Sequence, residues 1–304
     1  MNRPAIAALI IAVSSAATHA QITLKPSFKE GSTWAQRIEV KTEQTLTLNE
    51  NAVESASTQF MNVRSTVGER DADGLLPVKY KFDSLQVEGH LFSIPFSFDS
   101  FNPQKPAEDD PLKAFFDLFT ALYNAKWTVT LDEENQIEDV TLHEDENVDL
   151  PTPFQALYEA EYFKESFARE IARLPDEPVK VGDSWTRREP TRLGGGQVMT
   201  LEVEYTYAGT ARHNQQDAHK ITGVVKKVDF TQDPNQAAGP LYVARADLKA
   251  EQSEIVILFD PKVGQVVESR STLRVTGPMT MQAPNNKIPS KLDLRMQVTS
   301  QWQP

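Results

Sequence analysis

Near its start the chain reads Phe28-Lys29-Glu30-Gly31-Ser32-Thr33-Trp34, and past its middle it reads Val179-Lys180-Val181-Gly182-Asp183-Ser184-Trp185. In both stretches a glycine, two polar residues and a tryptophan precede a long segment of alternating apolar and polar residues. Alternation with a period of two is typical of an antiparallel strand that has one face on a core. The repeat therefore predicts a mainly β protein of two similar antiparallel curved-sheet units, related by internal duplication and accompanied by two amphipathic helices.

The strand pattern is clearest after the first tryptophan, where even-numbered positions are apolar and odd-numbered positions are charged. The apolar set is Ile38, Val40, Leu46 and Leu48, and the charged set is Arg37, Glu39, Lys41 and Glu43. Between Phe82 and Leu85 the apolar residues change from even-numbered to odd-numbered positions, which predicts a β-bulge near Asp83 and Ser84. Turns are expected at Asn49–Asn51, Asp73-Gly74 and Asp260–Gly264, and Asp132 opens a hairpin similar to the one at Asp260.

Two segments have helical spacing instead. Asp110 is a candidate cap and Pro111 a first helical residue, followed by apolar positions three and four apart up to Tyr123. A second helix is expected over 153–174, with Thr152 and Gln155 as a capping box. It ends at Pro175.

The predicted organisation follows from these patterns. Residues 1–20 form a signal peptide, 21–174 the first β unit, and 175–304 the second. The first unit contains an aromatic and helical insert at 89–125 and the connecting helix at 153–174. Because loops grafted on a repeated scaffold often carry specificity, the insert is where function is expected.

The first twenty residues have the features of an export signal. Arg3 supplies a positive charge, Ala5 to Val13 an apolar run, and Thr18-His19-Ala20 a small-x-small cleavage site. Cleavage after Ala20 and a periplasmic or extracellular location are expected. No comparable apolar run follows, so the mature chain is expected to contain no transmembrane segment.

Composition restricts the function further. The chain has no cysteine, so disulfides, thiol chemistry and lipid attachment to a cysteine are excluded. Removal of residues 1–20 leaves 30 basic against 43 acidic residues, a net charge of −13. Such a charge argues against a nucleic-acid partner.

The central stretch from Leu174 to Trp185 also has the pattern Leu-Pro-x-x-x-Val-x-x-Gly-Asp-Ser/Thr-Trp. Together with the opening Phe28 to Trp34, it resembles a family of exported bacterial proteins classed as a domain of unknown function. The likeness covers nearly all of the mature chain and implies an exported two-unit β protein. It transfers no activity and no catalytic residue.

Candidate catalytic and metal-binding groups have simpler interpretations. His213, Asp217 and His219 could bind zinc, but their polar surroundings favour a hairpin loop. The acids at 132–139 and 144–149 lack calcium-loop spacing and are read as solvated turns. No Gly-x-Ser-x-Gly elbow occurs, and Gly194–Gly196 lacks the lysine of a phosphate loop. No metal, cofactor or catalytic residue is therefore predicted, and the sequence favours a protein that is not an enzyme.

The insert is rich in phenylalanine, with seven of the fifteen within residues 92–119. These rings could line or cover an apolar cavity, or they could simply be core. The candidate ligand-binding residues are Phe92, Phe96, Phe98 and Phe101. A lid is favoured for Phe96 and Phe98 because Pro95 argues against a central strand, and core is favoured for Phe115 and Phe119.

These observations predict a soluble exported protein of the cell envelope or periplasm that binds an apolar small molecule or lipid without catalysis. A structural or interaction module that meets another envelope protein is the alternative. A hydrolase with two carboxylates and an outer-membrane barrel are the remaining interpretations.

Overall fold

The computed structural model describes residues 21–91, 93–143, 148–237 and 241–303, so the expected signal peptide lies outside the described residues. Thirteen antiparallel strands form one sheet, which confirms the mainly β fold. The strands are β1 (Thr33–Leu48), β2 (Asn51–Val67), β3 (Leu76–Leu91), β4 (Ile94–Asp99), β5 (Lys126–Leu131), β6 (Ile137–His143), β7 (Ser184–Gly194), β8 (Gln197–His213), β9 (Gln216–Gln232), β10 (Tyr242–Ala246), β11 (Lys249–Asp260), β12 (Gln265–Gln282) and β13 (Lys287–Gln303). The helices are α1 (Lys113–Asn124), α2 (Thr152–Gln155), α3 (Ala160–Ala172) and a 3₁₀ turn, η1 (Pro234–Gln236).

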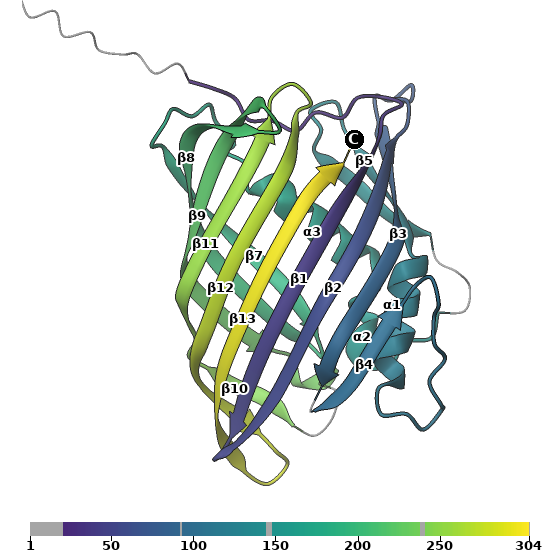
Figure 1. Ribbon diagram of the computed structural model, residues 1–304, viewed down its shortest axis with the longest axis vertical. Coiled ribbons are helices and arrows are strands. Elements are labelled where there is room, and N and C mark those ends of the chain that lie inside the picture. Colours follow the sequence, from purple (N-terminus) through teal and green to yellow (C-terminus); the bar gives the residue numbers. More distant parts are fainter. Residues whose placement is uncertain (1–20, 92, 144–147, 238–240, 304) are drawn as a thin grey trace, which may run out of the picture.

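The sheet is continuous and strongly curved (Figure 1). Its strand order is β6-β5-β3-β2-β1-β13-β12-β11-β9-β8-β7, with β4 paired to β3 and β10 paired to β12. The first and last strands of the chain, β1 and β13, pair in the middle and join the two halves. In the described residues β6 and β7 are the sheet edges, and α3 packs against both of them. The helix therefore bridges the gap that the curved sheet leaves open.

The repeated sequence motif makes the same turn in both places. The amide of Gly31 donates to the Val67 carbonyl at 3.1 Å, and the amide of Gly182 donates to the Tyr207 carbonyl at 2.9 Å. Gly31 and Gly182 both have positive φ, at 71° and 94°, a conformation that glycine adopts without strain. The glycine is thus required by the turn that starts each unit.

The strand registers repeat as well. The β2–β3 pairing shifts between Asn62 and Val63, and the β8–β9 pairing shifts between Glu202 and Val203, the same distance before Val67 and Tyr207. The β5–β6 pairing shifts between Thr130 and Leu131, and the β11–β12 pairing shifts between Leu258 and Phe259, so each shift lies directly before the residue that precedes Asp132 or Asp260. Asp83 is the unpaired residue of the first shift, which confirms the predicted bulge. These matching irregularities support a duplication, because each bulge is a specific local feature.

The helices differ in detail from the sequence prediction. Helix α1 begins at Lys113, and Asp110 Oδ1 accepts from the Leu112 amide at 2.8 Å just before it. The single helix expected over 153–174 is wrong, because α2 and α3 are separate. The expected capping box is also wrong, since Gln155 Nε2 donates to the Leu150 carbonyl at 3.1 Å and no side chain caps α2.

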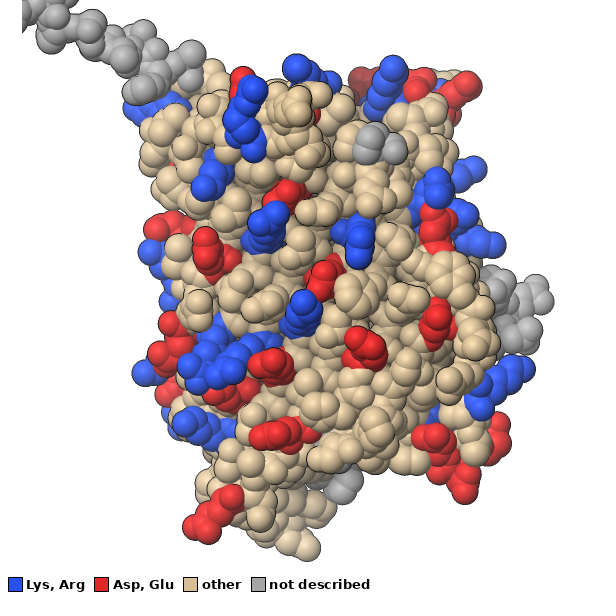
Figure 2. All heavy atoms as spheres, in the orientation of Figure 1, with Lys and Arg blue, Asp and Glu red and all other residues tan. Residues whose placement is uncertain are grey.

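The two faces of the sheet differ in chemistry. Charged side chains of both signs are scattered over the outer face (Figure 2). The inner faces carry the apolar cores, with one large cluster under β8–β13 and others under β3, α1 and α3. No helix in the described ranges is long and apolar enough to cross a bilayer.

Candidate functional site

The phenylalanine-rich insert forms a small core of its own. Phe98 on β4 is 1% exposed, and its ring centroid lies 5.6 Å from that of Phe119 and 6.4 Å from that of Phe116 on α1. Phe96 is half-buried and stacks on Phe119 at 6.3 Å. Burial of this kind stabilises a fold whether or not a ligand binds. The structure therefore favours a packing role for Phe98.

The other two candidate residues are not part of this core. Phe101 is 71% exposed, and Phe92 lies outside the described residues. Phe96 also borders a shallow surface hollow with Gly89 and His90. Of the predicted set, the structure thus brings only Phe96 and Phe98 together, and a ligand-binding role for the set stays a prediction.

The histidines considered for metal binding lie near the β8–β9 hairpin. Asp217 pairs with Arg212 at 3.0 Å, and His219 Nδ1 lies 2.8 Å from the Tyr207 hydroxyl. Burial lowers the pKa of His219, and the nearby charge of Asp260 partly opposes that shift. Across the described ranges, no three His, Cys, Asp or Glu side chains gather where they could hold a metal ion.

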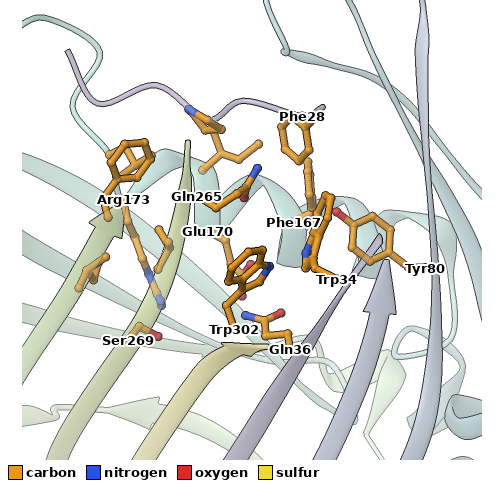
Figure 3. Close-up of a pocket in the computed structure, with 16 residues that line it drawn as sticks. Phe28, Trp34, Gln36, Tyr80, Phe167, Glu170, Arg173, Gln265, Ser269 and Trp302 are labelled. Atoms are coloured by element: carbon orange, nitrogen blue, oxygen red, sulfur yellow. The ribbon is translucent and has the colours of Figure 1, made fainter. Parts of the chain in front are cut away.

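A cavity that the sequence did not reveal lies inside the curved sheet, between α3 and the inner faces of strands from both units (Figure 3). Its volume is about 80 Å³. Pockets for drug-sized ligands measure about 300–1,000 Å³, so this space suits one small chemical group in the conformation described. Trp34 and Tyr80 line it from the first unit, Trp302 from the second, and Phe167 and Glu170 from α3.

Strand pairing places the tryptophans together. Trp34 and Gln36 lie on the inner face of β1, and Gln36 is paired directly with Trp302 on β13. Trp34 is paired with Ser65, which in turn is paired with Tyr80. Because residues paired across strands share a face, all of these side chains project to the same side of the sheet. The buried Ser65 is small, which leaves space between the larger rings.

The aromatic rings support one another around the cavity. Phe28, from the segment before β1, lies 6.1 Å from Trp34 and 6.2 Å from Phe167 between ring centroids. Tyr80 lies 5.8 Å from Phe167 in an edge-on arrangement. Behind Tyr80, Trp127 stacks on its ring at 5.4 Å. Such contacts fix ring positions and stabilise the wall.

Arg173, just after α3, is held by a buried carboxylate. Its guanidinium Nη2 lies 2.9 Å from Glu189 Oε2 on β7, and Glu189 also accepts a hydrogen bond from the Tyr205 hydroxyl. The Trp185 indole donates to the Arg173 carbonyl at 3.1 Å. Because Glu189 is 5% exposed, its carboxylate is shielded from water, and the pair ties the end of the helix to the sheet.

The local charges affect the pKa values of their neighbours. Burial raises the pKa of Tyr80, and the negative charge of Glu170 raises it further. Burial by itself would lower the pKa of Arg173, but several neighbouring groups, Glu189 first and Glu170 among them, together outweigh burial and leave the pKa raised. Burial likewise raises the pKa of Tyr205. The tyrosines are thus neutral and the arginine charged at physiological pH.

The Glu170 carboxylate and the Trp302 indole are polar groups of the lining without a partner among the described residues. Glu170 forms no hydrogen bond and no ion pair within 4.0 Å in the described parts of the chain, and it is an exposed residue beside the aromatic wall. The Trp302 Nε1 donor is buried without an acceptor there. Two lining amides are engaged, since Gln36 donates to Ser300 Oγ at 2.7 Å and Gln265 to the Ser27 carbonyl. The lining therefore combines aromatic faces with one unpaired carboxylate.

Three solved structures show a distant likeness to this chain. A lipovitellin structure described by its lipid–protein interactions is 11% identical, with a TM-score of 0.41 over 91% of this chain. This chain spans 26% of the length of that lipovitellin chain. DynF from the dynemicin pathway of Micromonospora chersina is 10% identical, with a TM-score of 0.21 over 98% of this chain and 92% of its own. The outer membrane protein OprG from Pseudomonas aeruginosa is 8% identical, with a TM-score of 0.23 over 90% of this chain and 97% of its own. All three scores are too low to support a functional argument.

Sequence comparison adds one family. No curated protein matches the chain. A family model described as a family of unknown function (DUF6263) matches residues 73–216, from the turn between β2 and β3 to the start of β9.

Proposed function

We propose that this protein binds an apolar or lipid-like ligand inside its curved sheet, without catalysis, in the periplasm or cell envelope. The observation that carries the proposal is the aromatic cavity under α3, which is formed by both units and is not filled by side chains. A concave site lined mainly by aromatic and apolar groups, with a few polar ones, is typical of small-molecule binding. Glu170 is the one carboxylate among the described residues of the lining, so a two-carboxylate hydrolytic mechanism has no support there.

The inner face of β1 extends this site. From the cavity onward it carries no charged residue and is half-buried along its length: Trp34, Gln36, Ile38, Val40, Thr42, Gln44, Leu46 and Leu48. By contrast, inner-face residues of β12 such as Val275 and Met279 are buried. An uncharged and incompletely covered strip is suited to the apolar part of a ligand.

The strip is long enough for a lipid chain. At roughly 3.3 Å per residue, the row from Trp34 to Leu48 extends about 45 Å. One extended acyl chain spans about half of the roughly 30 Å hydrocarbon core of a bilayer. A ligand whose head group occupies the cavity and whose acyl chain lies along the inner face of β1 therefore fits this site.

Ligand binding can be tested on protein exported from a bacterial host. Lipid extracts of the purified protein, analysed by mass spectrometry, should contain a bound amphiphile in stoichiometric amount. The neutral dye N-phenyl-1-naphthylamine should bind and fluoresce. Ser269→Phe, which fills the cavity, should abolish the signal, whereas Thr272→Phe on the outer face of the same strand should leave it unchanged. A clean extract with no dye binding would contradict the proposal and favour a protein-interaction module.

Export is part of the same proposal, supported by the sequence of residues 1–20. The protein should be released by osmotic shock, and Edman sequencing should start at Gln21. Retention in the cytoplasm with an intact Met1 would contradict it.

A further inference from the structure

The charged residues of the described lining are Glu170 and Arg173. Arg173 pairs at 2.9 Å with Glu189, which lies outside the lining, so the three groups together carry one net negative charge. That charge resides on Glu170, which in the described residues has no ion-pair or hydrogen-bond partner. Its influence reaches the cavity wall, since it raises the pKa of Tyr80. The charge of Glu170 also contributes to the raised pKa of Arg173, but among the described residues no cation lies within ion-pair distance of Glu170.

The walls of the cavity favour positive charge as well. Trp34, Tyr80 and Trp302 line the space together with Phe167, and Figure 3 shows their rings and Glu170 between the helix and the strands. A cation over an aromatic face is attracted by the negative face of the ring, most strongly by tryptophan. Several such rings around one site are typical of ammonium recognition.

We infer that this cavity binds an alkylammonium group, so that the ligand is an amphiphile with a positively charged amine head. The inference rests on the proposed function and specifies its ligand class. The ammonium lies among Trp34, Tyr80 and Trp302 with Glu170 as its counter-charge, and the alkyl part follows the inner face of β1. The volume of about 80 Å³ admits a head of this size and excludes a large sugar or nucleotide.

The alternative head groups fit less well. An anionic head would meet the unpaired Glu170 and would have only Arg173, which is already held by Glu189. A neutral head would leave the Glu170 carboxylate unused. The Trp302 indole donor, buried without a protein acceptor among the described residues, can be satisfied by an oxygen near the ammonium.

The test compares three probes that share an octyl group and differ in the charge of the head: octyltrimethylammonium, octyl glucoside and octyl sulfate. Each is used below its critical micelle concentration. Binding to the mature protein is measured by titration calorimetry. Octyltrimethylammonium should bind about tenfold more tightly than octyl glucoside, which corresponds to about 1.4 kcal/mol. Octyl sulfate should bind more weakly than either. High salt should reduce the preference, because it screens the attraction of Glu170.

Two variants of α3 separate the site from general charge effects. Glu170→Gln should remove most of the preference for the cation and leave octyl glucoside binding unchanged. Glu161→Gln changes the same charge on the same helix, but Glu161 lies outside the cavity, so it should change nothing. Both residues are exposed, so both variants are expected to fold, and their circular dichroism spectra should match that of the wild type.

The outcomes distinguish the two proposals. Equal binding of all three probes, or a cation preference that survives in Glu170→Gln, overturns the ammonium assignment and leaves the apolar-ligand function intact. If none of the probes and no neutral dye binds, the proposed function itself fails, and the ammonium assignment with it.

Discussion

The phenylalanine cluster of residues 96–119 and the aromatic cavity under α3 contain the same kind of side chain but are assembled differently. The first cluster comes from neighbouring parts of the chain, β4 and α1, and its central ring, Phe98, is 1% exposed. The second joins residues as far apart as Trp34 and Trp302, and it encloses a space of about 80 Å³. In this protein, aromatic residues that are close together in the sequence pack as core. Aromatic residues that are far apart in the sequence form the candidate site.

The difference has a physical reason. Helix α1 is connected to β4 by a loop and can settle onto its rings, so voids close. The cavity rings are fixed on strands of a continuous sheet, and α3 is attached to that sheet through Arg173 and Glu189. Neither side can move to fill the gap without breaking strand pairing or a buried ion pair.

The largest effect on stability is expected for Phe98→Ala. Truncation of a buried phenylalanine costs about 3–5 kcal/mol, and no ligand contact should be lost if the ring is core. Urea unfolding should show this loss, while binding of the neutral dye stays at the wild-type level. Phe101→Ala, at a residue that is 71% exposed, is the control and should be nearly neutral. If Phe98→Ala were stable but lost dye binding, Phe98 would act as a lid, and the phenylalanine cluster would be the binding site instead of core.

Arg173→Met should destabilise by about 3 kcal/mol, because it leaves Glu189 buried and unpaired. Denaturant unfolding measures the loss. Exchanging both partners, in Arg173→Met with Glu189→Leu, should restore most of the stability, since no uncompensated charge remains. A double variant as unstable as the single one would show that the loss comes from the missing contacts of the pair and not from an uncompensated buried charge.

Trp34→Ala should cost less stability, about 2 kcal/mol, because this ring is only half-buried. Its main effect is on binding, where octyltrimethylammonium should lose about tenfold or more in affinity as an aromatic face is removed. Trp34→Phe keeps a ring and should retain part of the affinity. If the stability loss matched that of Phe98→Ala with no change in binding, the cavity would be core like the phenylalanine cluster.

The smallest effect concerns pH and lies outside both clusters. Burial lowers the pKa of His219 in the folded state, whereas an unfolded histidine titrates near about 6.5. The stabilising contribution is complete above that value and is lost as the pH falls through the folded pKa. The loss should be less than about 1 kcal/mol, because the ring keeps contact with solvent. Unfolding at pH 7 and pH 5 should show it in the wild type and not in His219→Gln; an equal loss in both proteins would assign it to another group.

Much of the fold was predictable from local pattern. The alternating apolar residues Ile38 and Val40 predicted the inner face of β1. The one-residue shift of that alternation after Phe82 predicted the bulge at Asp83, and the two glycine motifs predicted equivalent turns. The break between α2 and α3 was missed because Leu157 and Phe163 continue the apolar spacing across it. That superposition of residues 31–142 on 182–275 pairs Trp34 with Trp185 and Asp132 with Asp260 stays a prediction.

The candidate site was harder to predict from the sequence than the fold. Parity could have marked Trp34 and Trp302 as inner-face residues, because Trp302 continues the row of Leu292, Leu294, Met296 and Val298. It could not have shown that they are neighbours. Glu170 looked like any exposed acid on a helix, since nothing in its surroundings along the chain indicates a cavity.

The sequence by itself determined the strands, the bulges and the turns, because alternation, glycine conformation and turn residues act over a few neighbouring positions. Only the tertiary structure decided that β1 pairs with β13, which makes one sheet of two units and sets Gln36 opposite Trp302. Antiparallel pairing is specified by complementary faces and not by a local code, so many partners fit one strand pattern. The cavity follows from that choice of partner and from the helix that bridges the two sheet edges.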